Sequence, residues 1–280
     1  MSTELLSLSF GLAAAFAWGL GDFSGGLATR RVSVLWVILT SSVLGFVFYT
    51  LLGLLFREPF PAWSQLGLGL AAGVVGGLGI IALFRAMAVG HMGIVSPVSA
   101  VLTAGIPVVF SAVFQGLPGP LQMLGFALAL AGVWVVSRPD ATGARSDGLL
   151  LAVLSGFAFA GFKILTAQLP DGSVFWPLAA ARVGGGVLML LLFLGLRDRP
   201  KLVWAALPLA AFSGLLDSLG NVGFLLSAQT GRLDSAAVLS ALYPAFTAVL
   251  AWVILKERLN ITQIGGIALM LVAIPLIAQK

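Results

Sequence analysis

The sequence is poor in the residues that most soluble domains and enzymes depend on. It contains no cysteine and a single histidine, His91. The lack of cysteine excludes a disulfide framework and thiol chemistry. Only 9% of the residues are charged, whereas a soluble domain carries roughly a quarter. With 60% hydrophobic residues and a mean hydropathy of +1.10, the chain cannot cover itself with polar surface, so we expect it to lie in lipid.

The sequence also lacks the motifs of several function classes. The 15 lysines and arginines are dispersed between apolar runs, so we expect no nucleic-acid partner despite the net charge of +5. There is no glycine-rich phosphate loop with lysine, no histidine pair with metal spacing and no nucleophile constellation. We therefore expect no metal, no other cofactor and no enzymatic activity. His91, beside Gly90, is expected to be a solvated turn residue.

The chain contains an internal repeat with an offset of about 141 positions. Residues 203–280 align with residues 62–139 without a gap. The coinciding landmarks include Trp204 with Trp63, Gly214 with Gly73, Gly231 with Gly90 and Ser240 with Ser99. We therefore predict two copies of one module, at residues 1–140 and 141–280.

Short polar, proline and glycine breaks divide the chain into ten apolar runs, each near the length of a membrane-spanning helix. No run alternates apolar and polar residues, which disfavours a barrel, so we predict an all-α integral membrane fold. The predicted spans are 5–28, 33–55, 65–87, 93–114, 120–137, 148–168, 175–196, 203–227, 234–254 and 261–278. The first run lacks a basic region and a cleavage pattern, and we interpret it as a retained span.

Each copy holds five predicted spans, and five is an odd number. The second copy therefore enters the membrane from the side opposite to the first, and the two form an inverted repeat. Inverted five-helix repeats are typical of transporters, in which two halves rock about a site near the midplane.

Ionisable residues inside the spans are costly in lipid and are therefore functional candidates. They are Asp22, Arg85, Lys163, Arg182 and Asp217, with Asn221 one turn after Asp217. Asp22 and Lys163 occupy equivalent repeat positions, but opposite span directions separate them by roughly 15 Å along the membrane normal. We hypothesise that Asp22 pairs with Arg85, and that Asp217 pairs with Lys163 or Arg182, as gates. The alternatives are static pairs that fix helix register, and arginines that extend to the headgroups.

Aromatic residues and prolines add candidates near the midplane. Trp18 lies in the middle of its span, so its indole N–H needs a buried partner, and Phe159 occupies the equivalent position. Pro107 and Pro244 free a backbone carbonyl four residues earlier, near Thr103 and Ser240. Each proline predicts either a kink that lines a cavity or a bend that serves packing. The cavity candidates are Trp18, Asp22, Ser99, Thr103, Phe159, Lys163, Asp217, Asn221, Ser240 and Tyr243.

Three motifs give the chain a resemblance to a known family. They are Trp18-Gly19, Ala180-Ala181-Arg182, and the stretch from Leu242-Tyr243-Pro244 through Lys256-Glu257-Arg258-Leu259 to Gln263-Ile264-Gly265-Gly266. With ten spans in two repeats, the sequence resembles EamA-type members of the drug/metabolite transporter superfamily. The first copy departs from the pattern, because Gln115-Gly116-Leu117-Pro118 stands where the second has Lys256 to Leu259.

The resemblance implies a metabolite exporter or exchanger, with a central cavity lined by spans 1–4 and 6–9 and braced by spans 5 and 10. It also implies hydrophobic or aromatic amino acids as substrates, a bacterial-type inner membrane and a monomer as the functional unit. The competing functions are an integral-membrane enzyme, which needs clustered catalytic residues, and a channel, which needs a continuous polar lining.

Overall fold

The computed structural model describes residues 3–89, 92–137, 148–196, 200–256 and 260–279. His91, residues 138–147 around the boundary between the two copies, and Glu257-Arg258-Leu259 lie outside these ranges. All regular elements of the described residues are helical. They are α1 (Thr3–Thr29), α2 (Val34–Leu55), α3 (Trp63–Val89), α4 (Met92–Phe114), α5 (Pro120–Val136), α6 (Leu149–Ala167), α7 (Phe175–Gly195), the short 3₁₀ helix η1 (Trp204–Ala206), α8 (Leu207–Thr230), α9 (Leu233–Ser240), α10 (Tyr243–Leu255) and α11 (Ile261–Ile277).

Each predicted span is helical, with ends within a few residues of those predicted. By length and composition, seven helical segments are suited to crossing a membrane, and three described apolar segments are shorter. The shorter segments are Val98–Phe114, Pro120–Val136 and Ile261–Ile277. A helix of 17 residues, such as α5 or α11, is about 25 Å long, slightly less than the roughly 30 Å of hydrocarbon in a bilayer.

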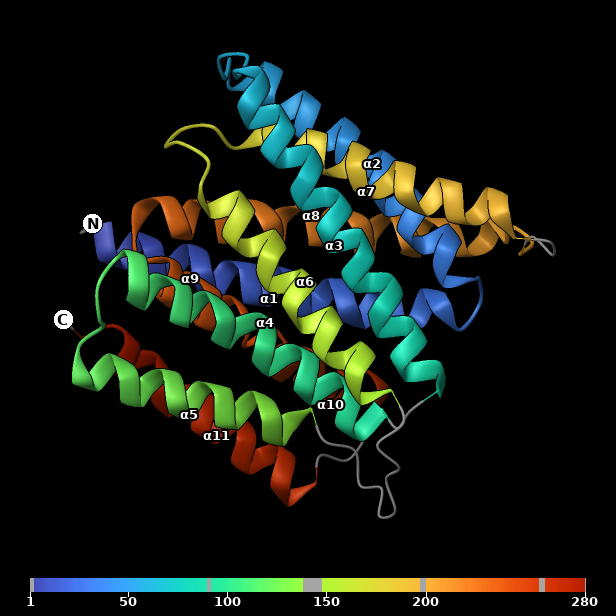
Figure 1. Cartoon of the computed structure of the whole chain (residues 1–280). Helices are drawn as coiled ribbons and strands as arrows, with labels where there is room; N and C mark the ends of the chain where they lie inside the picture. Colours follow the sequence, from blue (N-terminus) through green and yellow to red (C-terminus); the bar gives the residue numbers. More distant parts are fainter. Residues whose placement is uncertain (1–2, 90–91, 138–147, 197–199, 257–259, 280) are drawn as a thin grey trace.

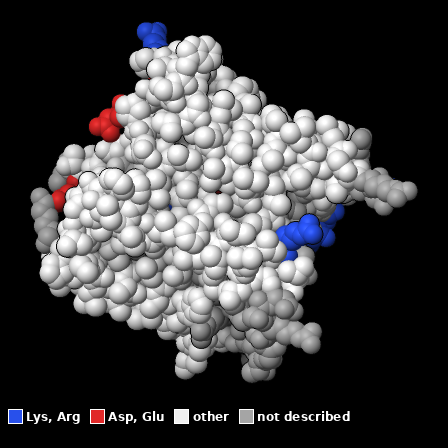
Figure 2. Space-filling model, viewed as in Figure 1, with Lys and Arg blue, Asp and Glu red and all other residues white. Residues whose placement is uncertain are grey.

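The surface of the bundle suits lipid. Large apolar side chains are exposed along the helices, among them Val43 at 63%, Leu191 at 62% and Leu271 at 62%. The face shown in Figure 2 is almost free of charged side chains, and the few that are visible lie toward its edges. A surface of this kind is stable where hydrocarbon surrounds it.

The two termini lie at the same end of the bundle, which we call the terminal end (Figure 1). Helix α1 begins there, whereas α6, its counterpart in the second copy, begins at the opposite end (Figure 1). Helix packing follows the duplication, because α1 packs along α8 while α6 packs along α3. Helices α2 and α7 contact each other, as do α5 and α11.

Helices α3 and α7 approach closely because small residues line their contact. A β-carbon on Gly73 would overlap the backbone carbonyl of Ala181, and one on Gly69 would overlap that of Pro177. In return, a β-carbon on Gly184 would overlap the carbonyl of Leu70. Gly69, Gly73 and Gly184 therefore serve backbone-to-backbone packing between the two copies.

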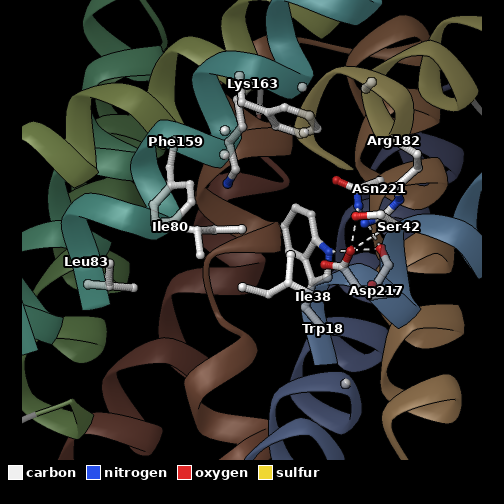
Figure 3. Close-up of a pocket in the computed structure, with 18 of the residues that line it drawn as sticks. Trp18, Ile38, Ser42, Ile80, Leu83, Phe159, Lys163, Arg182, Asp217 and Asn221 are labelled. Carbon is white, nitrogen blue, oxygen red and sulfur yellow. Dashed lines mark hydrogen bonds and ion pairs between the residues drawn. The ribbon is translucent and has the colours of Figure 1, made fainter. Parts of the chain in front are cut away.

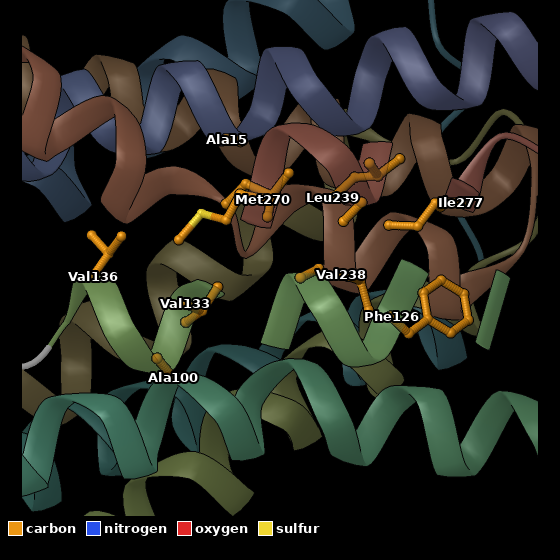
Figure 4. Close-up of a cluster of buried hydrophobic side chains, with 12 residues drawn as sticks. Ala15, Ala100, Phe126, Val133, Val136, Val238, Leu239, Met270 and Ile277 are labelled. Atoms are coloured by element: carbon orange, nitrogen blue, oxygen red, sulfur yellow. The ribbon is translucent and has the colours of Figure 1, made fainter. Parts of the chain in front are cut away.

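Helices α5 and α11 lie side by side and brace the rest of the bundle through one apolar cluster. Phe126 and Val133 of α5 and Met270 of α11 pack with Val238 and Leu239 of α9 (Figure 4). Ala15 of α1 and Ala100 of α4 complete the contact (Figure 4). Helices α5 and α11 therefore support the helices around the centre of the molecule.

The two predicted proline kinks differ in the structure. Helix α4 continues through Pro107 from Met92 to Phe114, so this proline does not end the helix. At the equivalent place in the second copy, the predicted span is split into α9 and α10, and Pro244 lies in the first turn of α10. Proline suits that position because its missing N–H has no partner to lose there. Where the sequence predicts a kink or a bend at Pro244, the structure thus has an interruption at Ala241 and Leu242 between two helical segments.

Candidate functional site

A cavity of about 410 Å³ lies in the centre of the bundle. Its walls come from α1–α4 and α6–α8, with Tyr243 from α10, and no described residue of α5 or α11 lines it. Figure 3 shows Trp18, Ile38, Phe159, Ile80 and Lys163 around the open space. A volume of this size is within the ~300–1,000 Å³ of typical small-molecule sites.

Most of the predicted site residues line this cavity. The predicted residues that do so are Trp18, Asp22, Ser99, Thr103, Phe159, Lys163, Arg182, Asp217, Asn221 and Tyr243. Ser240 lies behind the wall, hydrogen bonded to Lys163. Arg85, Pro107 and Pro244 are not part of the lining.

An ion pair between Arg182 and Asp217 organises one wall of the cavity. The guanidinium Nη2 lies 2.5 Å from Asp217 Oδ2 and also donates to Ser218 Oγ at 2.9 Å. The Asn221 amide donates to the backbone carbonyl of Asp217 at 2.8 Å and to Oδ2 at 3.3 Å. Of the two partners considered for Asp217, the structure therefore brings Arg182 to it. The dashed contacts in Figure 3 show this cluster beside Ser42.

Trp18 has the buried partner that its position requires. Its indole Nε1 donates to the backbone carbonyl of Asp217 at 3.3 Å. The ring fits against α8 because Gly220 has no side chain to collide with it. It stacks on Phe224 with ring centroids 6.2 Å apart, and it makes a T-shaped contact with Tyr243 with ring centroids 6.4 Å apart. Trp18 therefore joins α1, α8 and α10 at the cavity.

Lys163 is held without an acidic partner among the described residues. Its side chain is only 4% exposed, and its ammonium donates to Ser240 Oγ at 3.1 Å and the Ala237 carbonyl at 3.3 Å. Both acceptors belong to the last turn of α9, where the helix dipole favours a cation. The ammonium also lies 5.2 Å from the ring centroids of Trp18 and Phe224. The break after α9 thus provides the site that compensates this buried charge.

The hypothesised pair of Asp22 with Arg85 is not formed. Asp22 lines the cavity and is exposed to it, and within the described part of the chain it has no ion pair or hydrogen bond. Arg85 is exposed near the end of α3 and does not reach the cavity. Depth along the membrane normal suggested the pair, but only Asp22 of the two lines the cavity.

Sequence reasoning missed several polar residues of the site. Tyr49, Ser42 and Ser213 line the cavity, and the Tyr49 hydroxyl donates to the Ser218 carbonyl at 3.0 Å. The signal for Tyr49 was present, because a tyrosine inside an apolar span needs a partner for its hydroxyl. The serines carry no such signal, since serine is ordinary at helix contacts in membranes.

The profile of the EamA-like transporter family matches residues 5–138 and again residues 146–279. The chain therefore belongs to the EamA-like transporter family, and it is a multi-pass membrane transporter of small solutes. None of the curated proteins compared with it gives a match. A solved structure described only as the crystal structure of a protein is similar in fold, with a TM-score of 0.82 at 17% identity, covering 96% of this chain and 95% of that chain.

Proposed function

We propose that the protein is a secondary transporter that exports or exchanges hydrophobic or aromatic amino acids, or related metabolites, across a bacterial-type inner membrane. Ten spans form two inverted five-helix repeats, at residues 1–140 and 141–280. The solute binds in the central cavity and is exposed to each side in turn. The transporter works as a monomer in the lipid bilayer and needs no cofactor.

The central cavity is the observation that carries this proposal. Residues at equivalent repeat positions meet there, because Trp18 and Phe159 both line it, as do Asp22 and Lys163. Aromatic rings and apolar side chains such as Ile80 make much of the cavity wall apolar, which suits the body of an apolar or aromatic solute. The opposite starting ends of α1 and α6 support the inverted arrangement (Figure 1).

Contacts at the terminal end support a conformation closed on that side. The Glu58 carboxylate accepts the backbone N–H groups of Val174 at 2.9 Å and Phe175 at 2.7 Å, at the start of α7. Ser7 and Ser227 exchange hydrogen bonds to each other's carbonyls at 2.8 and 2.7 Å, joining α1 to α8.

Arg232 closes the same end. Its guanidinium bonds the fully buried carboxylate of Asp234 at 2.7 Å and the Gly116 carbonyl at 2.7 Å, which ties the loop before α9 to the loop after α4. The cavity lining reaches Asp22, Leu83 and Ser213 in the helix halves away from the termini, and also Tyr49 and Leu178 in the halves toward them. The contacts that hold the terminal end together therefore support access from the opposite end.

We propose that the Arg182–Asp217 pair is part of the moving gate. Asp217 is 43% exposed and Arg182 16%, so the pair lies at the cavity surface and solute can reach it. Parting the pair costs free energy unless solute or water replaces the contact. A solute that substitutes for one partner therefore favours the other conformation.

Transport by reconstituted protein tests the proposal. Proteoliposomes containing the full chain are given labelled aromatic and branched amino acids, with and without a pH gradient, and empty liposomes serve as the control. We expect saturable uptake of at least one solute, reduced in Asp217→Asn and unchanged in Asp171→Asn, a matched change in the exposed α6–α7 turn. Absence of uptake for the whole panel would remove amino acids as substrates.

The absence of native cysteine allows a direct test of access. Ser213→Cys places one thiol in the cavity, and a membrane-impermeant thiol reagent is applied to either side. We expect labelling from one side without solute, and a changed rate with a transported solute. Equal labelling from both sides at once would instead indicate a channel.

A further inference from the structure

The charges that reach the cavity are unequal in sign. Lys163 is 4% exposed, and its ammonium is covered by Ser240, Ala237 and two aromatic rings. The side chain of Arg182 is 16% exposed, whereas that of its partner Asp217 is 43% exposed. Asp22 is exposed to the cavity without a partner in the described chain. The accessible charge of this cavity is therefore carboxylate rather than ammonium or guanidinium.

The two carboxylates belong to one wall, where α1 packs on α8. Gly21, the residue before Asp22, approaches α8 so closely that a β-carbon there would lie 3.4 Å from the backbone nitrogen of Asp217. Ser213, one turn before Asp217, donates to the Gly21 carbonyl at 2.7 Å. Trp18, one turn before Asp22, is bonded to the carbonyl of Asp217. Asp22, Asp217 and the Trp18 ring thus line the same side of the open space.

We propose that this wall is an amine-binding site, so that the transported solute carries a protonated amino group held by Asp22 with Asp217 and Trp18. The proposal rests on the transporter function above, and it identifies the amino group as the part of the solute that the cavity recognises by charge. An ammonium group offers three donors, which suits the carboxylate oxygens of Asp22 and Asp217, and the Trp18 ring, which already stacks on Phe224 beside Lys163, bounds the site. The apolar body of the solute then lies toward Phe159 and Ile80, which line the cavity with Trp18 (Figure 3).

Lys163 does not offer an equivalent site for an anion. Two acceptors on α9 already receive its protons, and the rings of Trp18 and Phe224 flank the charge. A carboxylate that bound there would first have to displace contacts that compensate a buried cation. The exposed and unpaired Asp22 has no such contact to lose, because nothing in the described chain is bonded to it.

Three ligands with the same aromatic body distinguish recognition of an amino group from recognition of a carboxylate. Purified full-length protein in detergent is titrated by calorimetry with 2-phenylethylamine, 3-phenylpropanoate and phenylalanine. We expect the amine to bind more tightly than the carboxylate. Asp22→Asn should weaken amine binding about tenfold or more, since a hydrogen bond between two charged groups is lost. Asp22→Glu should retain it, and Asp171→Asn should match the wild type.

The outcomes distinguish this inference from the transporter function. Preferential binding of 3-phenylpropanoate, abolished in Lys163→Met, would refute the amine site while leaving a transporter in place. Amine binding that is equal in Asp22→Asn and wild type would also refute it. If none of the three ligands binds to folded protein, the amine site is refuted, and the proteoliposome panel decides the function separately. Elution of each variant as a monodisperse peak establishes that it is folded.

Discussion

Two glycines on the same helix provide the sharpest test of how the two repeats contact each other. On α3, a β-carbon added at Gly73 would overlap the backbone carbonyl of Ala181 on α7, whereas one added at Gly67 would meet nothing within 4 Å. Both residues lie inside a helix, so alanine gains the same helix propensity of about 1 kcal/mol at either position. The substitutions differ only in what surrounds them.

The expected magnitude follows from these surroundings. Overpacking costs about 1–3 kcal/mol, and a backbone carbonyl cannot rotate away, so Gly73→Ala lies at the upper end of that range. After the gain in propensity, we expect Gly73→Ala to lower stability by about 2 kcal/mol. Gly67→Ala should raise stability by up to about 1 kcal/mol.

Thermal unfolding in detergent, followed by tryptophan fluorescence, compares the two variants with the wild type. The melting temperature should fall for Gly73→Ala and stay equal or rise for Gly67→Ala. Equal melting temperatures for the two variants would show that α3 and α7 do not approach at Gly73 as described. Because this contact joins the two repeats, Gly73→Ala should also reduce transport more than Gly67→Ala does.

Three further predictions concern polar contacts. The losses of transport in Arg182→Gln and Asp217→Asn should not add, so that the double variant transports no less than the less active of the two single variants. Additive losses would contradict a shared role of the two residues as an ion pair. Lys163→Met should unfold at or above the wild-type temperature, as the exposed control Lys201→Met should, because it removes a buried charge that has no carboxylate partner among the described residues. A large fall in the unfolding temperature would show that the contacts of Lys163 with α9 outweigh the cost of its desolvation. Glu58→Ala should destabilise by about 1–2 kcal/mol, measured by thermal unfolding, because two backbone N–H groups at the start of α7 lose their acceptor.

The helices were predictable because lipid imposes a simple rule on the sequence. Apolar runs of spanning length, separated by charged residues, proline and glycine, leave few alternatives to a helix for each run. The break between α9 and α10 was predictable only as a distortion of the helix near Pro244. Proline frees a backbone carbonyl whether the helix bends or is interrupted, and which of the two occurs depends on packing around Ala241 and Leu242.

The partners of the charged residues were less predictable. Sequence position gives the depth of a side chain in the membrane, but its direction around the helix depends on how each helix is rotated in the bundle. Arg85 has a depth suited to Asp22 yet is exposed near the end of α3. The acceptors of Lys163 include a backbone carbonyl, of Ala237, which no residue type reveals.

The duplication explains why the scaffold is nearly symmetric while the site is not. The indole of Trp36 donates to the Pro200 carbonyl at 2.8 Å, and that of Trp176 donates to the Glu58 carbonyl at 3.1 Å, so each repeat holds a loop of the other. Matched contacts of this kind suit two conformations of similar energy, which the proposed alternating access requires. The equivalent positions of Asp22 and Lys163 instead carry opposite charges, and only the carboxylate faces the cavity unpaired. In the proposed mechanism, a symmetric frame supplies the motion of alternating access, and the difference between these two residues orients the bound solute through its amino group.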